Sequence, residues 1–132
     1  MRKFVWASPH NPTPQQLEEL NTEGEVSYLK EINSELFDRI CDCPSHPQEL
    51  KRLRADLTSQ IYALVNPLKE GIPTLVQPGG SPAFQFLLGK SRASLILPVW
   101  YGHSKRVSED RPQPDGTIQK FSVYKHEGWT KL

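Results

Sequence analysis

Residues 74–85 read T-L-V-Q-P-G-G-S-P-A-F-Q, an apolar run that stops at two glycines and resumes as the start of a helix. The run Thr74–Gln77 has the composition of a buried strand, and Pro82 suits the first turn of a helix. A strand that turns on glycine into a helix is a repeating unit of α/β proteins. The same arrangement presents backbone N–H groups to an anion in some proteins and forms a plain turn in others.

Upstream of this stretch, strand-like and helix-like segments alternate. Apolar Lys3–Ser8 does not alternate with polar residues, which predicts a central strand. Thr13 as N-cap, with Pro14 and with Gln16 at the capping-box position, predicts a helix that Gly24 ends. A second strand is expected over Glu25–Leu29. Helical stripes then cover Glu31–Cys41 and a longer segment that opens at His46-Pro47 and closes near Pro67 and Gly71.

Downstream, the expected elements are a helix from Pro82 to about Arg92, a strand over Leu95–Tyr101 and a hairpin. The hairpin arms are Arg106–Arg111 and Thr117–His126, which flank the turn signal Pro114-Asp115-Gly116. Strands that alternate with helices favour a parallel sheet. We therefore predict one α/β domain over residues 1–132: a small Rossmann-like three-layer fold with a mostly parallel central sheet (core about 1–106) and a C-terminal β-hairpin (about 106–128).

Composition narrows the function classes. The net charge of +1 gives no global field of the kind that marks general DNA-binding or membrane-surface proteins. No apolar stretch reaches the roughly 18 residues that a membrane-spanning helix needs. The N-terminus runs into Pro9 and Pro12 without the length of a signal-peptide core. A soluble cytoplasmic protein is expected, with no DNA or membrane partner.

The only cysteines are Cys41 and Cys43, which with His46 form C-x-C-x-x-H. The spacing is poor for a structural disulfide. Three metal ligands are conceivable, but a zinc site needs a fourth ligand or an open water position. Two reduced thiols near the end of a helix is the interpretation that we favour, so no metal and no cofactor are expected.

Ligands of parallel α/β sheets bind beyond the carboxyl ends of the strands, at a topological switch point. Three segments follow predicted strands: Ser8-Pro9-His10-Asn11, Gln77-Pro78-Gly79-Gly80-Ser81, and Tyr101-Gly102-His103-Ser104-Lys105-Arg106. Taken singly, the first segment is explained as a proline-stiffened turn, the second as a glycine turn and the third as a solvent-exposed basic run. Together they offer hydroxyl, amide and basic groups without clustered carboxylates, which indicates a phosphate-bearing ligand held without a metal.

Three segments are similar to one known family: F-V-W-A-S-P-H-N-P-T-P-Q-Q (4–16), T-L-V-Q-P-G-G-S-P-A-F (74–84), and P-V-W-Y-G-H-S-K-R (98–106) with P-D-G-T-I-Q-K-F-S-V-Y-K-H (114–126). The chain resembles the small CARF-like proteins of type III CRISPR systems, of the Csx group associated with ring-nuclease activity. The resemblance implies a CARF-like fold and a homodimer that binds a cyclic oligoadenylate, above all cyclic tetra-adenylate. It also implies that this RNA messenger is linearised without a metal, by attack of a ribose 2′-hydroxyl on its phosphodiester.

The resemblance also implies roles for individual residues. Lys105 and Arg106 are expected to clamp the scissile phosphate, with Ser8 and His10 beside the ribose. Gly79, Gly80 and Ser81 are expected to donate to a phosphate, and Gln77 to read an adenine edge. His126 is expected to be structural or to contact the ligand from the hairpin, and His103 is an alternative to His10. Tyr101 and Ser104 complete the expected ligand-binding set.

Two other functions remain open at this stage. The family pattern has an acid within the glycine turn and an arginine soon after the hairpin histidine, where this chain has Pro78-Gly79-Gly80 and Glu127-Gly128-Trp129-Thr130. A protein that binds the messenger without cutting it, as a sponge or sensor, is therefore the second hypothesis. A housekeeping nucleotide-binding or structural dimer is the third.

Overall fold

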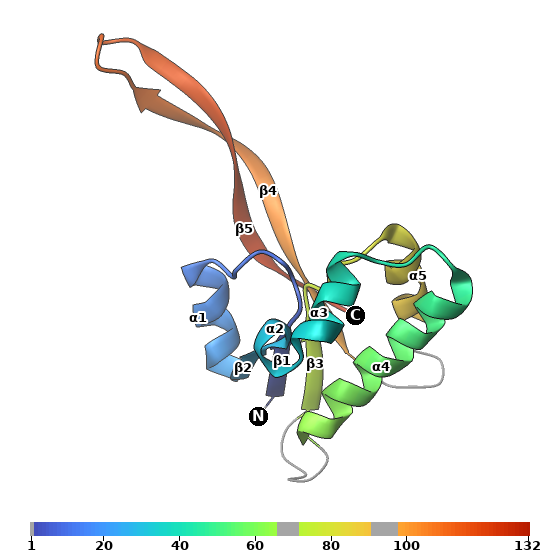
Figure 1. Ribbon diagram of the computed structural model, residues 1–132. Coiled ribbons are helices and arrows are strands. Elements are labelled where there is room, and N and C mark those ends of the chain that lie inside the picture. Colours follow the sequence, from blue (N-terminus) through green and yellow to red (C-terminus); the bar gives the residue numbers. More distant parts are fainter. Residues whose placement is uncertain (1, 66–71, 91–97) are drawn as a thin grey trace.

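The computed structural model describes residues 2–65, 72–90 and 98–132, which form a five-stranded sheet flanked by helices (Figure 1). The strand order is β2-β1-β3-β4-β5, with all neighbours parallel except the antiparallel pair β4–β5. The predicted α/β fold with its mostly parallel sheet and C-terminal hairpin is confirmed. The elements are β1 (Arg2–Trp6), α1 (Pro14–Glu23), β2 (Gly24–Tyr28), α2 (Leu29–Ile32), α3 (Ser34–Cys41), α4 (Pro47–Val65), β3 (Ile72–Val76), α5 (Pro82–Lys90), β4 (Val99–Pro112) and β5 (Ile118–Lys131).

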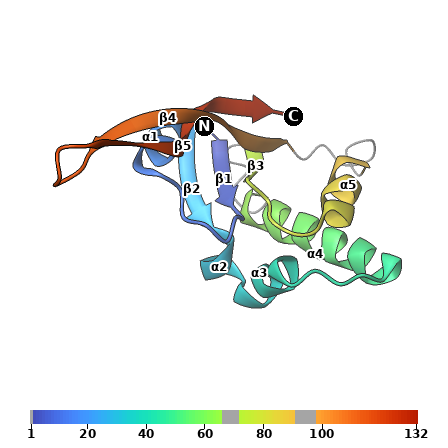
Figure 2. The same ribbon diagram turned by 90° about the horizontal axis from the view of Figure 1, so that it is seen from above.

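The sheet separates two apolar clusters, one on each face. Helix α1 packs on one face through Leu20, which meets side chains of β1, β3 and β4. Helices α3, α4 and α5 cover the other face, as Figure 2 shows. Alternate residues of β1 serve the two faces, as the period of a strand requires. The α1 cluster contains Phe4, Trp6, Leu20, Val76 and Trp100, and the larger cluster includes Val5, Leu36, Ile40, Leu53, Leu57, Ile61, Leu75 and Phe84.

The topological switch point lies between β1 and β3. These strands are neighbours in the sheet, but the chain leaves β1 for the helix on one face and leaves β3 for a helix on the other. Their carboxyl ends are joined by a hydrogen bond of 3.0 Å from Ala7 N to Val76 O. In folds of this type, loops that diverge from a switch point open a crevice for ligands.

Strands β4 and β5 form a ribbon much longer than the rest of the sheet. Each has 14 residues, and in the part of the chain that the structure describes β3 pairs with β4 through Leu75↔Val99 and Val76↔Trp100. The ribbon then projects from the body of the molecule (Figure 1). The register shifts between His103 and Ser104, which pair with Gly128 and His126, so Glu127 is an extra bulged residue. We call residues 104–126 the arm.

Two of the expected elements differ from those in the structure. The helix expected over Glu31–Cys41 is broken, because Asn33 leaves helical geometry and caps α3 by accepting a hydrogen bond from Leu36 N. The expected strand and first hairpin arm are one strand, because β5 pairs along all of β4. Pro67, Gly71, Arg92 and Leu95, which marked other expected boundaries, lie outside the described residues. None of the helices in the described ranges combines the length and the apolar character that crossing a bilayer requires.

The close pairing of β1 and β2 depends on a glycine. A Cβ placed on Gly24 would lie 2.2 Å from the Arg2 carbonyl oxygen, whereas a Cβ on Gly89 in α5 would meet nothing within 4 Å. Gly24→Ala should therefore lower the free energy of unfolding by about 1–3 kcal/mol, because backbone must shift. Gly89→Ala, the matched control, should raise it by about 0.5–1 kcal/mol through helix propensity. Urea denaturation measures both, and a Gly24→Ala variant as stable as the wild type would contradict the assignment.

Candidate functional site

The glycine turn after β3 lies against the loop after β1. Gln77 turns the chain with a φ of 49°, and Gly80 follows with a φ of 100°. Gly79 N donates to Ala7 O at 3.3 Å, and a Cβ on Gly79 would lie 3.3 Å from Pro9 Cδ. The first two segments that the sequence singled out therefore meet at the switch point.

Tight packing explains why this turn needs Gly80. Besides its positive φ, a Cβ there would lie 2.8 Å from the Phe84 ring and 3.1 Å from Cys43 Sγ. Ser81 Oγ accepts a hydrogen bond of 3.3 Å from Phe84 N and so caps α5. The N–H groups of Gly80 and Ser81 donate to no described residue, so these two donors remain for an anion.

A glutamine that sequence reasoning missed fixes the shape of the turn. Gln85 Nε2 donates to Pro78 O at 2.6 Å and to Gly79 O at 2.7 Å. Gln85 Oε1 accepts a hydrogen bond of 2.5 Å from the Tyr101 hydroxyl. The network ties the turn to β4, so Tyr101 supports the site through Gln85.

The loop after β1 is held by local hydrogen bonds that leave the His10 imidazole exposed. Ser8 Oγ accepts from His10 N at 3.1 Å, and Trp6 Nε1 donates to His10 O at 2.7 Å. The Ser8 hydroxyl keeps its own proton to donate. The His10 ring bonds to nothing within residues 2–65, 72–90 and 98–132. This loop therefore presents a hydroxyl and a free imidazole beside the glycine turn.

Gln77 is committed to the fold by its backbone and its side chain. Its N–H donates to Trp100 O at 2.9 Å, and its Oε1 accepts from Gly102 N at 2.5 Å. A Cβ on Gly102 would lie 3.6 Å from this oxygen and 3.0 Å from Gln16 Nε2. The Gln77 side-chain Nε2 has no partner among the described residues and so is available to a ligand such as an adenine edge.

His126 lies in a polar cluster between β5 and α1. Its side chain is 4% exposed, and its Nε2 lies 2.7 Å from Glu19 Oε2. Its Nδ1 lies 3.4 Å from Gln16 Nε2, and its ring meets the edge of Trp129. Because the Gln16 amide nitrogen only donates, Nδ1 is the acceptor and Nε2–H donates to Glu19. Of the two roles expected for His126, the structural one fits this burial.

The basic segment is not a loop at a strand end: Tyr101–Arg106 is part of β4. Lys105 pairs with Lys125 and Arg106 with Tyr124, so alternation places these two cations on opposite faces of the ribbon. Both are exposed, as are His103 and Ser104. In this strand, Lys105 and Arg106 of one chain therefore do not point toward the same phosphate.

The predicted residues thus form three groups. Ser8, His10, Gly79, Gly80 and Ser81 meet at the switch point, while Gln77, Tyr101 and His126 are engaged in the fold beside them. The remaining four, His103, Ser104, Lys105 and Arg106, run along the ribbon. Sequence reasoning missed Glu19 and Gln85, and it recognised Gln16 only as the capping-box residue of the helix and not as a partner of His126.

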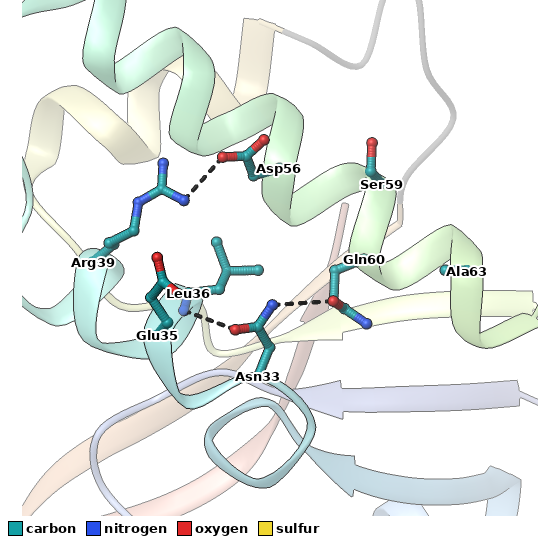
Figure 3. Close-up of a pocket in the computed structure, with 8 residues that line it drawn as sticks. All are labelled: Asn33, Glu35, Leu36, Arg39, Asp56, Ser59, Gln60 and Ala63. Atoms are coloured by element: carbon teal, nitrogen blue, oxygen red, sulfur yellow. Dashed lines mark hydrogen bonds and ion pairs between the residues drawn. The ribbon is translucent and has the colours of Figure 1, made fainter.

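A cavity of about 430 Å³ lies elsewhere, between α3 and α4 (Figure 3). Four of its polar side chains pair with one another: Arg39 pairs with Asp56 at 2.9 Å, and Asn33 donates to Gln60 at 3.2 Å. None of the predicted site residues lines it. The cavity is therefore no part of the candidate site.

The C-x-C-x-x-H segment holds two free thiols. Cys41 is exposed and Cys43 lies under the glycine turn. Slight burial of the Cys41 sulfur, together with the nearby Asp38 carboxylate, raises the pKa of this thiol above its usual value. His46 Nδ1 accepts from Gln48 N at 3.2 Å. Among the residues that the structure describes, no group of three or more His, Cys, Asp or Glu side chains is placed to hold a metal ion.

The Tyr101–Gln85 contact predicts a pH dependence of stability. Burial raises the pKa of Tyr101 above its ordinary value of 10.0, so the folded chain keeps the phenol proton where the unfolded chain loses it. The free energy of unfolding should therefore fall as the pH rises above about 10. Tyr101→Phe should make this fall shallower and lower stability at neutral pH by about 0.5–1.5 kcal/mol. Urea denaturation at pH 7–11 measures both effects, with Tyr124→Phe, an exposed tyrosine, as control; equal slopes for Tyr101→Phe and the wild type would contradict the prediction.

Comparison with known proteins gives a family. A sequence model of the family described as "Uncharacterized protein MJ1673 family" matches residues 2–130, nearly the whole chain. No curated protein and no solved structure matches the chain. The matched range includes both loops of the switch point and the arm. The chain belongs to the MJ1673 family.

Proposed function

We propose that this protein is a ring nuclease that binds cyclic tetra-adenylate, or a related cyclic oligoadenylate, and linearises it without a metal, so switching off type III CRISPR signalling. The observation that carries the proposal is the meeting of two loops at the switch point. There the free N–H groups of Gly80 and Ser81 lie in a turn packed against the loop of Ser8 and His10. Backbone donors at a helix N-terminus suit a phosphate group.

The histidines support an assignment of roles. His126 has both ring nitrogens engaged, and His103 Nε2 lies 3.4 Å from a Glu127 oxygen. The His10 ring is exposed and has no partner among the described residues. We therefore place His10 beside the ribose as the proton acceptor, with the Ser8 hydroxyl orienting the reacting group.

The reaction requires little covalent work from the protein. The ribose 2′-oxygen bonds to the adjacent phosphorus, the bond from phosphorus to the 5′-oxygen of the next nucleotide breaks, and a 2′,3′-cyclic phosphate remains. The 2′-hydroxyl proton passes to the His10 imidazole, and the leaving 5′-oxygen takes up a proton. Only RNA carries this nucleophile, which is held within the substrate itself. Lys105 would stabilise the charge that develops on the scissile phosphate, and Gly80 and Ser81 would hold a neighbouring phosphate of the ring.

A second candidate is binding without cleavage. Gln77 and Gly79 have already used a side-chain oxygen and an N–H within the fold, and the ribbon separates Lys105 from Arg106. As a result, fewer free hydrogen-bond donors and cations are left to contact one phosphodiester than the proposed cleavage requires. These observations are the reason to keep a sponge or sensor as the second candidate, and the assay below distinguishes it from the enzyme.

A homodimer forms part of the proposal. A two-stranded ribbon in water is marginally stable alone, and the arm has unpaired edges and exposed apolar side chains. Tyr124 is 74% exposed and Ile118 is 66% exposed. Val107 faces Val123 in register, and the Phe121 ring lies under the Arg111 guanidinium. A second copy that covers the arm would bury these groups and bring two switch points to one cyclic ligand.

The decisive assay incubates the purified protein with labelled cyclic tetra-adenylate in EDTA. We expect linear products that end in a 2′,3′-cyclic phosphate, resolved by chromatography. Lys105→Ala should lower the rate about 10²–10³-fold, the usual effect of removing one donor to a developing oxyanion. Lys120→Ala is the matched control, since Lys120 faces Asp110 near the arm tip, and it should retain the rate. Tight binding without product would support the sponge, and absence of binding would refute both functions.

The dimer is tested by shortening the arm. Replacement of residues 107–123 by Asn-Gly joins the paired residues Arg106 and Tyr124 through a two-residue hairpin turn. Light scattering should give two chains of 15.1 kDa for the wild type and a single chain for the shortened protein. Circular dichroism checks that the shortened protein is folded. A shortened protein that still forms a dimer would show that the arm is not the interface.

A further inference from the structure

Two lysines face each other across the ribbon. Lys105 of β4 and Lys125 of β5 are direct partners in the antiparallel register. Side chains in this relation have Cβ atoms about 4.5–5.5 Å apart, and like charges directly opposite each other are destabilising. Elsewhere in the same ribbon, Asp110 faces Lys120, which is the favourable arrangement. The register therefore places two like charges opposite each other, and their repulsion lowers the stability of the folded chain.

No carboxylate of the described residues relieves this repulsion. The ion pairs of the ribbon join Arg111 to Glu109 and His103 to Glu127, and neither lysine takes part in one. Lys131, at the base of β5, lies 3.9 Å from Glu23. Both Lys105 and Lys125 are exposed, so their ammonium groups are accessible to an ion from solution.

The pair stands on the face of the ribbon that leads to the glycine turn. Alternation along β4 places Lys105 on the same face as Tyr101, four residues earlier. The Tyr101 hydroxyl bonds to Gln85, which holds the carbonyls of Pro78 and Gly79. At about 3.3 Å per residue, the lysines stand roughly 13 Å along the strand from that contact. A ligand with several phosphates could contact both places.

We infer that Lys105 and Lys125 together form one anion-binding site that holds a phosphate group of the ligand. Two ammonium groups supply several donors, and a bound phosphate turns their mutual repulsion into attraction for a shared anion. Lys125 thereby becomes a binding residue that sequence reasoning had left out. The inference rests on the proposed function for the nature of the natural ligand; the site itself follows from the register.

The test uses pyrophosphate as the probe, added to the full chain at constant ionic strength. Thermal unfolding should show that pyrophosphate raises the melting temperature of the wild type with a saturable dependence. Lys105→Gln and Lys125→Gln should each raise the Kd for pyrophosphate at least about tenfold, the size expected for a lost charge-assisted contact. Lys120→Gln should leave the Kd unchanged. Without anion, Lys125→Gln should melt no lower than the wild type, because it removes a repulsion.

Each other outcome would overturn the inference. If pyrophosphate does not raise the melting temperature of the wild type, the lysine pair is not an anion-binding site. This conclusion holds whether the lysines face solvent or face acidic side chains of a second copy. An equal loss in Lys120→Gln would show diffuse attraction to the ribbon instead of a site.

Parallel binding measurements with cyclic tetra-adenylate separate this inference from the proposed function. If both lysines control pyrophosphate binding but the wild type does not bind the cyclic messenger, the site stands and the proposed function fails. If the messenger binds and is cleaved while Lys125→Gln leaves its affinity unchanged, the proposed function stands and this inference fails.

Discussion

The junction at Gln77 holds the ribbon on the sheet. Within the described residues, two residue pairs join β3 to β4, which is little contact for a strand that carries a long projecting hairpin. Gln77 extends this contact by two hydrogen bonds, from its N–H to Trp100 O and from Gly102 N to its side-chain oxygen. Its left-handed backbone makes both possible, and such a conformation in a residue other than glycine persists only when its surroundings hold it. The placement of the glycine turn, of Tyr101 and of the lysine pair all depends on this junction.

A second anchor ties the base of the ribbon to α1. The cluster of Gln16, Glu19 and His126 joins the first helix of the chain to its last strand. Gln16 also caps α1, where its Oε1 accepts from Thr13 N while Thr13 Oγ1 accepts from Gln16 N. One glutamine thus fixes both the start of the helix and the orientation of the histidine. The ribbon is held on both faces of the sheet, by Gln85 on one and by this cluster on the other.

Local patterns predicted much of the fold, because they depend on neighbouring residues. The capping box at Thr13, the glycine turn and the alternation of strands and helices are confirmed. The break at Asn33 was missed because its cap competes with a helical stripe that continues on both sides.

The site was harder to predict, since its residues meet through the register. Gln16 and His126 lie 110 residues apart, and nothing local to either one signals the other. Whether neighbours such as Lys105 and Arg106 share a pocket depends on whether the segment is a loop or a strand. The sequence does not distinguish a loop from a strand here, because the exposed part of β4 has no alternation of apolar and polar residues.

The bulge at Glu127 divides β5 into two parts with independent alternation. Trp129 and His126 are three residues apart and would point to opposite faces of a regular strand, but the extra residue lets both contact the α1 side. Beyond the bulge, the pairing with β4 alone decides which face of the ribbon each side chain of the arm occupies. Relatives could therefore lengthen or shorten the arm by matched steps in the two strands while the buried base keeps its contacts. The bulge makes the ribbon a modular element, in which the reach toward a ligand or a partner can evolve separately from the fold that supports it.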